Sequence, residues 1–232
     1  MKAKRTEPEA GTPKPKKLAS ALEAAARTEV RIVAGDLRGR KVNCRVTPDL
    51  RPTPQMVREA FFSILGNAIP GRPFVDIFAG TGVVGMEAIS RKAKSASFIE
   101  RDFALANVLQ DHLKKFGIVA KSKLFRTDCY RWISSYQPPN EPINVFVSPP
   151  FADLHERPEV LLAAVKQLQE KVAIESVIVL QIERDSPFEE MSEFVDWDRR
   201  TYSRNVLLIW QKEGPAPAAA NQDDETIHPL DE

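Results

Sequence analysis

Cysteine and histidine are scarce in this sequence. Its 232 residues include only two cysteines, Cys44 and Cys129, which lie far apart, and three scattered histidines. Zinc sites need several such ligands at short characteristic spacings, and disulfide scaffolds need many cysteines. We therefore expect no metal ion and a reducing compartment, which for this chain means a cytoplasmic location.

Long apolar runs are missing as well. No hydrophobic stretch reaches the roughly 18–20 residues that span a bilayer, and the N-terminus lacks the apolar segment of a signal peptide. We therefore expect no membrane association. The hydrophobic content of 43% is nevertheless sufficient for one α/β domain with a sizeable core.

A large net charge is also absent, because the formal total is only +1. The charges are distributed unevenly, however. Residues 1–72 hold 15 Lys and Arg against 7 Asp and Glu, whereas residues 214–232 hold five acids and no Lys or Arg. A basic N-terminal third favours a polyanionic partner. We expect residues 1–28 to be a disordered basic tail and residues 214–232 a disordered acidic tail.

Residues 29–72 predict a small N-terminal extension. Strands expected at 30–34 and 41–46 flank a glycine-containing turn, which is typical of a β-hairpin. Thr53 is expected to cap the helix that follows, in which apolar residues recur at helical spacing as far as Gly66.

From residue 73 to residue 213 the pattern alternates between strand and helix. Strands are expected at 74–78, 97–99, 123–126, 143–147 and 177–182, and helices at 82–91, 103–116, 130–134 and 158–171. The stretch 201–210 predicts an added antiparallel edge. This order predicts an α/β fold with a doubly wound, mostly parallel sheet covered by helices on both faces. Ligands of such sheets bind beyond the carboxyl ends of the strands.

A glycine-rich segment follows the first of these strands and begins a helix. Its candidate cofactor-binding residues are Asp76, Phe78, Gly80, Gly82 and Gly85. The glycines let the backbone turn sharply and approach a ligand closely. The carboxylate of Asp76 favours a cationic ligand over a pyrophosphate.

Two further acids end the next two strands. Glu100 is placed to accept hydrogen bonds from ribose hydroxyls. Asp128 can accept one from an adenine amino group or, about equally well, cap the helix that follows it. With the glycine-rich segment, these residues predict S-adenosyl-L-methionine as the cofactor, and NAD(P) is the alternative ligand.

The segment Ser148-Pro149-Pro150-Phe151 follows the apolar strand expected at 143–147. Its two prolines end the strand in a rigid, extended turn. Such a turn presents a hydroxyl, carbonyl oxygens and an aromatic ring at fixed positions, which suits a flat nucleobase, although a plain proline-rich loop has the same composition. Ser148, Pro149 and Phe151 are our candidate catalytic residues.

Motifs from the hairpin to this turn resemble one known family. The matching stretches are Arg31-Ile32-Val33-Ala34-Gly35, Arg38-Gly39-Arg40, Leu50-Arg51-Pro52-Thr53, Val57-Arg58-Glu59, Asp76-Ile77-Phe78-Ala79-Gly80-Thr81-Gly82, Gly85-Met86-Glu87-Ala88, Glu100 and Phe146-Val147-Ser148-Pro149-Pro150-Phe151. Together they resemble the RsmD family of bacterial small-subunit rRNA methyltransferases, over roughly residues 30–213. The resemblance implies a Rossmann-like class I S-adenosylmethionine-dependent methyltransferase fold, with the hairpin and first helix as an N-terminal extension that binds RNA.

The resemblance also implies an activity and a partner. The expected reaction is methylation of the N2 amino group of a guanine in 16S rRNA, on the 30S ribosomal subunit, by a monomer. The Ser148 hydroxyl and the Pro149 carbonyl would accept hydrogen bonds from that amino group, and Phe151 would stack on the base. The candidate phosphate contacts are Arg31, Arg38, Arg40, Arg51 and Arg58. For Arg58 the alternative is an ion pair with a nearby acid such as Glu59 or Asp76.

Some positions differ from the family's usual pattern. Ser148 stands where the family has an aspartate, Gln181 and Glu183 stand where it has two glutamates, and Ser203 or Arg204 stands where it tends to have glycine. The loss of the acid at position 148 favours an alternative, a catalytically weakened or inactive RNA-binding homologue. A methyltransferase acting on DNA adenine or protein glutamine is a third reading, and the basic hairpin argues against it.

Overall fold

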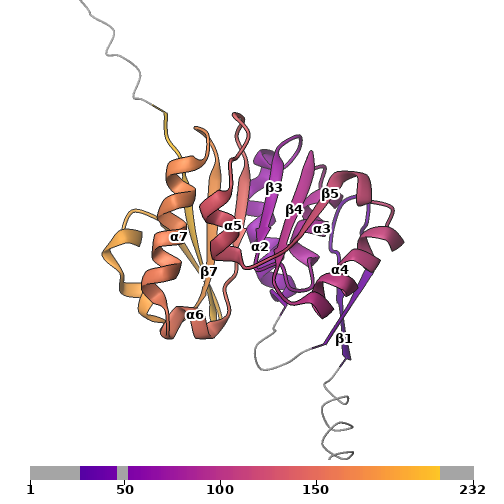
Figure 1. Cartoon of the computed structure of the whole chain (residues 1–232), viewed down its shortest axis with the longest axis horizontal. Helices are drawn as coiled ribbons and strands as arrows, with labels where there is room; N and C mark the ends of the chain where they lie inside the picture. The colour runs from indigo at the N-terminus through magenta and orange to yellow at the C-terminus, as the bar shows by residue number, and fades with distance from the viewer. Residues whose placement is uncertain (1–26, 46–51, 215–232) are drawn as a thin grey trace, which may run out of the picture.

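The computed structural model describes residues 27–45 and 52–214. A hairpin of β1 (Arg27–Arg31) and β2 (Lys41–Arg45) comes first, and helix α2 (Gln55–Leu65) follows it. A seven-stranded sheet with helices on both faces forms the remainder (Figure 1). The two tails expected to be disordered lie outside the described residues, apart from the few that border them.

The sheet is built from strands that alternate with helices along the chain. In order these are β3 (Pro73–Ile77), α3 (Val83–Ser90), β4 (Ser95–Glu100), α4 (Phe103–Lys115), β5 (Ser122–Arg126), α5 (Cys129–Ser135), β6 (Asn144–Val147), α6 (Phe151–His155), α7 (Pro158–Lys171), β7 (Val177–Glu183), β8 (Asp198–Tyr202) and β9 (Asn205–Gln211). The strand order is β5-β4-β3-β6-β7-β9-β8. The pairs from β5 to β7 are parallel, whereas β9 is antiparallel to both β7 and β8. The predicted doubly wound sheet is therefore confirmed.

Most of the predicted elements are present, although β1 covers Arg27–Arg31 instead of the expected 30–34. Two further differences concern the path of the chain. The stretch 201–210 forms not one edge strand but the hairpin of β8 and β9, whose turn places Ser203 in the left-handed region at φ 53°. The short helix α6 directly follows the two prolines, where only a loop was expected. Both differences arise at turns, where a few residues decide the path of the chain.

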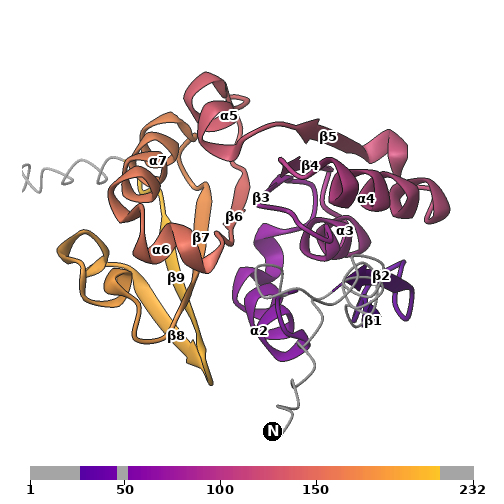
Figure 2. The same cartoon turned by 60° about the horizontal axis from the view of Figure 1, so that its bottom comes forward.

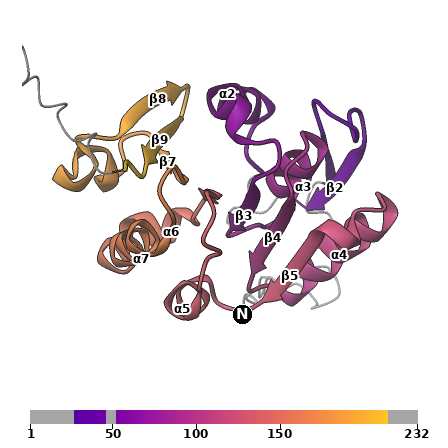
Figure 3. The same cartoon turned by 90° about the horizontal axis from the view of Figure 1, so that it is seen from above.

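Two apolar layers cover the two faces of the sheet (Figures 2 and 3). One layer is formed by α2, α3, α4 and the hairpin, with Phe74, Phe98 and Phe146 pointing toward them from the strands. The other is formed by α5, α6 and α7, with Val145 and Val147 pointing toward them. Because side chains alternate along a strand, residues two apart share a face. The same alternation determines which polar residues near the strand ends lie on one face of the sheet and can meet there.

The hairpin is docked on the body of the protein rather than detached from it. The Ser90 carbonyl at the end of α3 accepts a hydrogen bond from the backbone N–H of Asp36, at 2.9 Å. Gly35 packs so closely that a Cβ atom there would lie 1.9 Å from the same carbonyl oxygen. On α4, the buried His112 accepts a hydrogen bond at Nε2 from the backbone N–H of Asn43, at 3.1 Å. The extension and the sheet therefore share one core.

Thr53 does not cap α2 as expected. Helix α2 begins after Pro54, in extended conformation at φ −56° and ψ 149°, and no side chain caps it. The buried Thr53 hydroxyl instead donates to Oε1 of Gln181 on β7, at 2.9 Å. The prediction was wrong because a distant strand offers this hydroxyl an acceptor.

Candidate active site

A cavity of about 710 Å³ opens at the carboxyl ends of the parallel strands. This volume is in the usual range for small-molecule and cofactor sites. The loops after β3, β4, β6 and β7 line it, together with the segment before α2 and the turn between β8 and β9. Among the predicted site residues, those lining it are Asp76, Phe78, Gly80, Glu100, Ser148, Pro149 and Phe151. One cavity therefore joins the predicted cofactor residues to the predicted catalytic turn.

The glycine-rich segment turns sharply between β3 and α3. Gly80 and Gly82 adopt left-handed conformations, at φ 53° and 70°. Gly85 has a different role, because a Cβ atom there would lie 2.4 Å from the ring of Phe98. It lets α3 pack tightly on β4 and does not line the cavity. The three glycines thus shape the loop, and only Gly80 lines the cavity wall.

Phe78 is the first residue after β3 and carries backbone strain. Its φ is 62°, a left-handed conformation that a bulky residue rarely adopts. Its ring meets Tyr130 edge-on, with the centroids 5.7 Å apart. Such strain costs about 1–3 kcal/mol and tends to occur at functional sites. The strained residue here forms part of the predicted cofactor wall.

Asp76 is a buried acid near the end of β3, just before the glycine-rich turn. Its Oδ2 accepts a hydrogen bond from the backbone N–H of Gly85, at 2.9 Å. Burial raises the pKa of Asp76 to about 8, the Gly85 hydrogen bond opposes this rise, and the nearby charge of Glu100 adds to it. A cation placed beside this carboxyl group would stabilise its ionised form.

Glu100 is held in place by two backbone hydrogen bonds. One carboxylate oxygen accepts from the N–H of Gly80 at 2.7 Å, and the other from the N–H of Asp102 at 2.8 Å. Each carboxylate oxygen has capacity for a second donor. Glu100 is therefore fixed in orientation yet can still accept hydrogen bonds from two adjacent hydroxyl groups.

Asp128 caps the helix that follows it, which was the alternative to contact with adenine. Its side chain accepts a hydrogen bond from the backbone N–H of Arg131 at 3.0 Å and so caps α5. It does not line the cavity. The geometry favours the capping role over contact with adenine, and replacing Asp128 tests the choice directly, as described in the Discussion.

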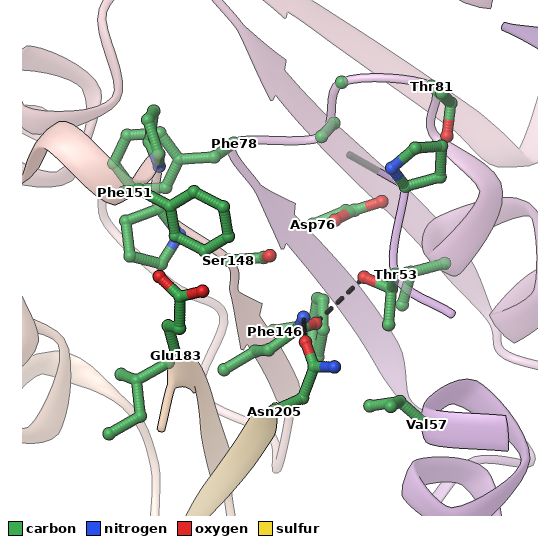
Figure 4. A pocket seen from close by; sticks show the side chains of 18 of the residues that line it. Thr53, Val57, Asp76, Phe78, Thr81, Phe146, Ser148, Phe151, Glu183 and Asn205 are labelled. Carbon is green, nitrogen blue, oxygen red and sulfur yellow. Dashed lines mark hydrogen bonds between the residues drawn. The ribbon is translucent and has the colours of Figure 1, made fainter. Parts of the chain in front are cut away.

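The turn after β6 lies at the centre of the cavity wall. The backbone N–H of Ser148 donates to the carbonyl of Ile77, at 3.3 Å, which ties this turn to the end of β3. Figure 4 shows the Ser148 hydroxyl pointing into the cavity on the side of Asp76. Pro149 is buried, and Phe151 begins α6. The turn thus presents the predicted hydroxyl and ring to the same space.

Sequence reasoning missed a polar chain that crosses the cavity (Figure 4). The hydroxyl of Thr53 donates to Oε1 of Gln181, whose Nε2 donates to Oδ1 of Asn205, at 2.9 Å in each case. The chain joins the N-terminal extension to the C-terminal hairpin. One signal for it was available, since Gln181 is a polar residue within the apolar strand β7.

Glu183 ends β7, and in the sequence only the family pattern distinguishes it. Its Oε1 pairs with Nη2 of Arg204 at 3.2 Å, and the two side chains are 26% and 68% exposed. Both residues line the cavity. Glu183 therefore adds a partly exposed carboxylate on the side where Phe151 lies.

The predicted phosphate-binding arginines divide into three groups. Arg31, Arg38 and Arg40 are exposed on the hairpin and its turn. Arg51 lies outside the described residues. Arg58 is fully buried, so our assignment of this residue to phosphate contact needs correction.

The environment of Arg58 explains this correction. Its Nε pairs with Oε2 of Glu87 on α3 at 3.2 Å, and its two Nη atoms donate to the carbonyls of Thr53 and Arg31, at 2.6 and 2.7 Å. Glu87 is also fully buried and pairs with Arg91 at 2.9 Å. Arg58 therefore joins the hairpin and the segment before α2 to α3, and its guanidinium group does not reach the surface.

Residues 27–45 and 52–214 contain neither a cluster suited to a metal ion nor a helix that could span a membrane. In these ranges no group of three or more His, Cys, Asp or Glu side chains is arranged to hold a metal ion. The helices found there are all too short or too polar to cross a bilayer.

Comparisons with known sequences point to one family. A family model described as "Conserved hypothetical protein 95" matches residues 30–211. "Ribosomal RNA small subunit methyltransferase D" from Haemophilus influenzae is 34% identical over 166 residues, which are 70% of this chain and 83% of that relative. The protein of the same name from Buchnera aphidicola is 33% identical over 125 residues, and the match spans 64% of its length.

Solved structures show the same fold. A "putative methyltransferase yhhF" from Escherichia coli has a TM-score of 0.65 and 29% identity, over 80% of this chain and 99% of that one. A 16S rRNA N2 G1207 methyltransferase from T. thermophilus, solved with AdoMet and guanosine, has a TM-score of 0.62 at 19% identity, over 81% of this chain and 50% of that one. At that identity the likeness shows the fold alone. The predicted Rossmann-like class I methyltransferase fold is confirmed.

Proposed function

We propose that this chain is an S-adenosylmethionine-dependent rRNA methyltransferase. It belongs to the family described as "Conserved hypothetical protein 95", the RsmD family. The proposed acceptor is the N2 amino group of a guanine in 16S rRNA of the small ribosomal subunit. The observation that carries the proposal is the single cavity shared by Asp76, Glu100 and the turn at Ser148. A binding protein without methyl transfer would not need that combination.

The residues of the cavity suit S-adenosylmethionine. When bound, this cofactor supplies an electrophilic methyl group on a sulfonium centre. Glu100 would accept hydrogen bonds from the ribose hydroxyls with its remaining lone pairs. Asp76 would face the cationic end, next to the glycine turn that brings the backbone close. NAD(P) fits less well, because a pyrophosphate beside these two acids would be repelled.

We expect the affinity for S-adenosylmethionine to depend on pH through Asp76. Its pKa of about 8 means that the unliganded protein holds this group largely protonated at pH 6, whereas a cationic ligand favours the carboxylate. Binding should therefore release a proton, and affinity should rise by up to about tenfold per pH unit from pH 6 to pH 8 and then level off. Calorimetry at several pH values measures this slope.

Asp76→Asn provides the control for this pH dependence. The variant should bind the cofactor weakly and with little dependence on pH between 6 and 8, because it has no group to ionise. A wild-type affinity that is flat over this range, with no proton released, would show that Asp76 does not face the cation.

The turn after β6 would position the target base. The Ser148 hydroxyl and the Pro149 carbonyl would accept hydrogen bonds from the amino group, and Phe151 would stack on a base removed from its RNA stack. The guanine N2 lone pair is delocalised into the ring, so holding the amino group in one orientation supplies much of the rate.

The direct test is methyl incorporation into 30S particles and the effect of position 148 on its rate. We expect slow methyl transfer by the wild-type protein. Ser148→Asp should be about five- to tenfold faster, because a hydrogen bond to a charged acceptor is about 1 kcal/mol stronger than one to a neutral hydroxyl. Ser148→Ala should be slower than wild type. Equal rates for the wild type and Ser148→Ala would remove Ser148 from the mechanism.

A non-catalytic RNA-binding role is the second candidate, and the neutral residue at position 148 favours it. It predicts cofactor binding without methyl transfer. Wild-type protein and Ser148→Asp would then both be inactive on 30S particles, although both bind them. Measuring binding and methyl transfer on the same preparations separates the two functions.

We propose that the exposed hairpin arginines Arg31, Arg38 and Arg40 contact rRNA phosphates. Each lost contact should lower the steepness of the salt dependence of binding by about 0.7–0.9 in a plot of log affinity against log salt. The slope of this plot should thus be less steep by about 1.5 for the Arg38→Ala/Arg40→Ala variant. A control variant, Lys114→Ala/Lys121→Ala, removes two exposed charges elsewhere. The arginine proposal fails if the slope changes by the same amount in both variants.

A further inference from the structure

We infer that Glu183 supplies the carboxylate that receives the donor edge of the target purine, a role that the neutral Ser148 cannot fill alone. This inference rests on the proposed function and names a residue of the same cavity. Guanine presents N1–H and an N2 amino hydrogen side by side. A carboxylate accepts two parallel hydrogen bonds from such a pair of donors, whereas a single hydroxyl oxygen cannot match both. The amino hydrogen next to N1–H would be shared between Glu183 and the Pro149 carbonyl, and the Ser148 hydroxyl would accept the other amino hydrogen.

Strand register places Glu183 on the required face of the sheet. Strands β6 and β7 are parallel, with Val147 opposite Leu180. Residues at even spacing from one another share a face, so Gln181 and Glu183 project to the same side as Ser148 beyond the strand ends. All three line the cavity. Figure 4 shows the carboxylate of Glu183 directed into this space from β7, on the side of Phe151.

Four other acids line the cavity, and each has its carboxylate engaged within the protein. Asp76 accepts from the backbone of Gly85, Glu100 from the backbones of Gly80 and Asp102, and Asp102 from the first turn of α4. Asp153 is buried, accepts from the hydroxyl of Tyr130 at 2.5 Å and pairs with Arg157 at 2.6 Å. These contacts hold the four acids to the loop, to α4 and to α5.

Glu183 differs from these four in the kind of partner it has, which is neither a backbone N–H nor a buried side chain. Within the part of the chain that the structure describes, its carboxylate has one partner, the exposed Arg204. Such exposed pairs contribute little to stability and exchange readily. Oε1 accepts from Arg204, so Oε2 and the remaining lone pair of Oε1 are available to a ligand.

The neighbouring amide cannot take the same role. Gln181 uses its Oε1 for the hydroxyl of Thr53 and its Nε2 for Asn205. Its orientation is therefore fixed by partners on two other segments. Among the side chains of β7 that face the cavity, Glu183 is the one that carries a charged and accessible acceptor.

The test compares two nucleotides that differ in the amino group alone. Guanosine 5′-monophosphate and inosine 5′-monophosphate share N1–H, and the second lacks the 2-amino group. Binding to the protein saturated with S-adenosylhomocysteine is measured for the wild type, Glu183→Gln and two controls. Arg204→Ala removes the partner and leaves the carboxylate, and Glu190→Gln removes an exposed acid outside the cavity. Thermal unfolding checks that each variant is folded.

We expect the wild type to bind the guanine nucleotide roughly 10- to 100-fold more tightly than the inosine nucleotide, since a hydrogen bond to a charged group is involved. Glu183→Gln should lose most of this preference, while Arg204→Ala and Glu190→Gln keep it. Methyl transfer to 30S particles should fall by a similar factor in Glu183→Gln, and Ser148→Asp should restore part of it in the double variant.

Either of two results would overturn the inference. The first is a wild type without preference for the guanine nucleotide. The second is a Glu183→Gln variant that keeps the preference, and if it binds both nucleotides equally more weakly, the role of Glu183 is structural. A wild type that shows the Glu183-dependent preference but transfers no methyl group would refute the proposed enzyme function and leave the role of Glu183 in base binding standing.

Discussion

Arg58→Leu should lower the free energy of unfolding by about 3–5 kcal/mol, the usual cost of removing one partner from a buried ion pair. Arg58 and Glu87 are both fully buried, and the guanidinium group also holds the carbonyls of Thr53 and Arg31. Leucine fills part of the space but leaves both carbonyls without this donor. Urea unfolding of the wild type and the variant measures the difference.

Arg91 provides the matched control for this prediction. It pairs with the same carboxylate of Glu87, yet its side chain is 24% exposed and its guanidinium group lies over the ring of Phe62. Water can replace it in part, so Arg91→Leu should cost much less, about 1 kcal/mol. The double variant Arg58→Leu/Glu87→Leu should be more stable than Arg58→Leu alone, because no buried carboxylate then remains with only the partly exposed Arg91 to pair with it. Equal costs for Arg58→Leu and Arg91→Leu would contradict this account.

Arg58→Leu should also weaken RNA binding indirectly. Arg58 fixes the hairpin and the segment before α2 against α3. If the hairpin loosens, its exposed arginines lose their fixed spacing. The original assignment of Arg58 to a phosphate contact predicts instead a loss of RNA binding with unchanged stability. The two measurements together distinguish these roles.

The second large effect is expected at Glu100. Glu100→Gln should weaken the binding of S-adenosylmethionine roughly 100-fold, because hydrogen bonds to a charged acceptor contribute about 1.5–3 kcal/mol each and tenfold in affinity corresponds to about 1.4 kcal/mol. The glutamine amide has only one acceptor oxygen for the N–H groups of Gly80 and Asp102, so the loop loses a contact as well. Calorimetry with S-adenosylmethionine measures the loss.

Asp128→Asn is the natural comparison for Glu100→Gln. Asparagine caps a helix about as well as aspartate, so the fold should be retained. If Asp128 only caps α5, cofactor affinity should change less than about threefold. A loss similar to that of Glu100→Gln would restore the adenine contact predicted from the sequence. The same outcome would contradict the division of roles that the geometry indicates.

The regular elements could be predicted because their causes are local. Apolar alternation and helical spacing are properties of short segments, and helix α7 has the predicted bounds, Pro158–Lys171. Asp76, Glu100 and Ser148 were found because each lies at or next to the carboxyl end of a strand, and the ends of parallel strands meet at one edge.

The errors share a different cause. Thr53 was expected to bond to its own helix and bonds to Gln181, 128 positions away. Arg58 was a candidate for a phosphate contact or for pairing with a nearby acid, and the acid that it pairs with is Glu87 on α3, 29 positions away. Glu183 gained its candidate role only through the register of β7 on β6. In each case the side chain has several possible partners, and the sequence does not say which one lies near.

By itself, then, the sequence determined the α/β class, the order of strands and helices, and which strand ends carry acids, glycines and the proline turn. These follow from periodicity and from residue types that restrict the backbone. Only the tertiary structure decided which polar groups are occupied and which are free. That distinction separates Glu100 and Asp76, which accept hydrogen bonds from the loop backbone, from Glu183, whose partner is the exposed side chain of Arg204. It depends on contacts between segments far apart in the chain.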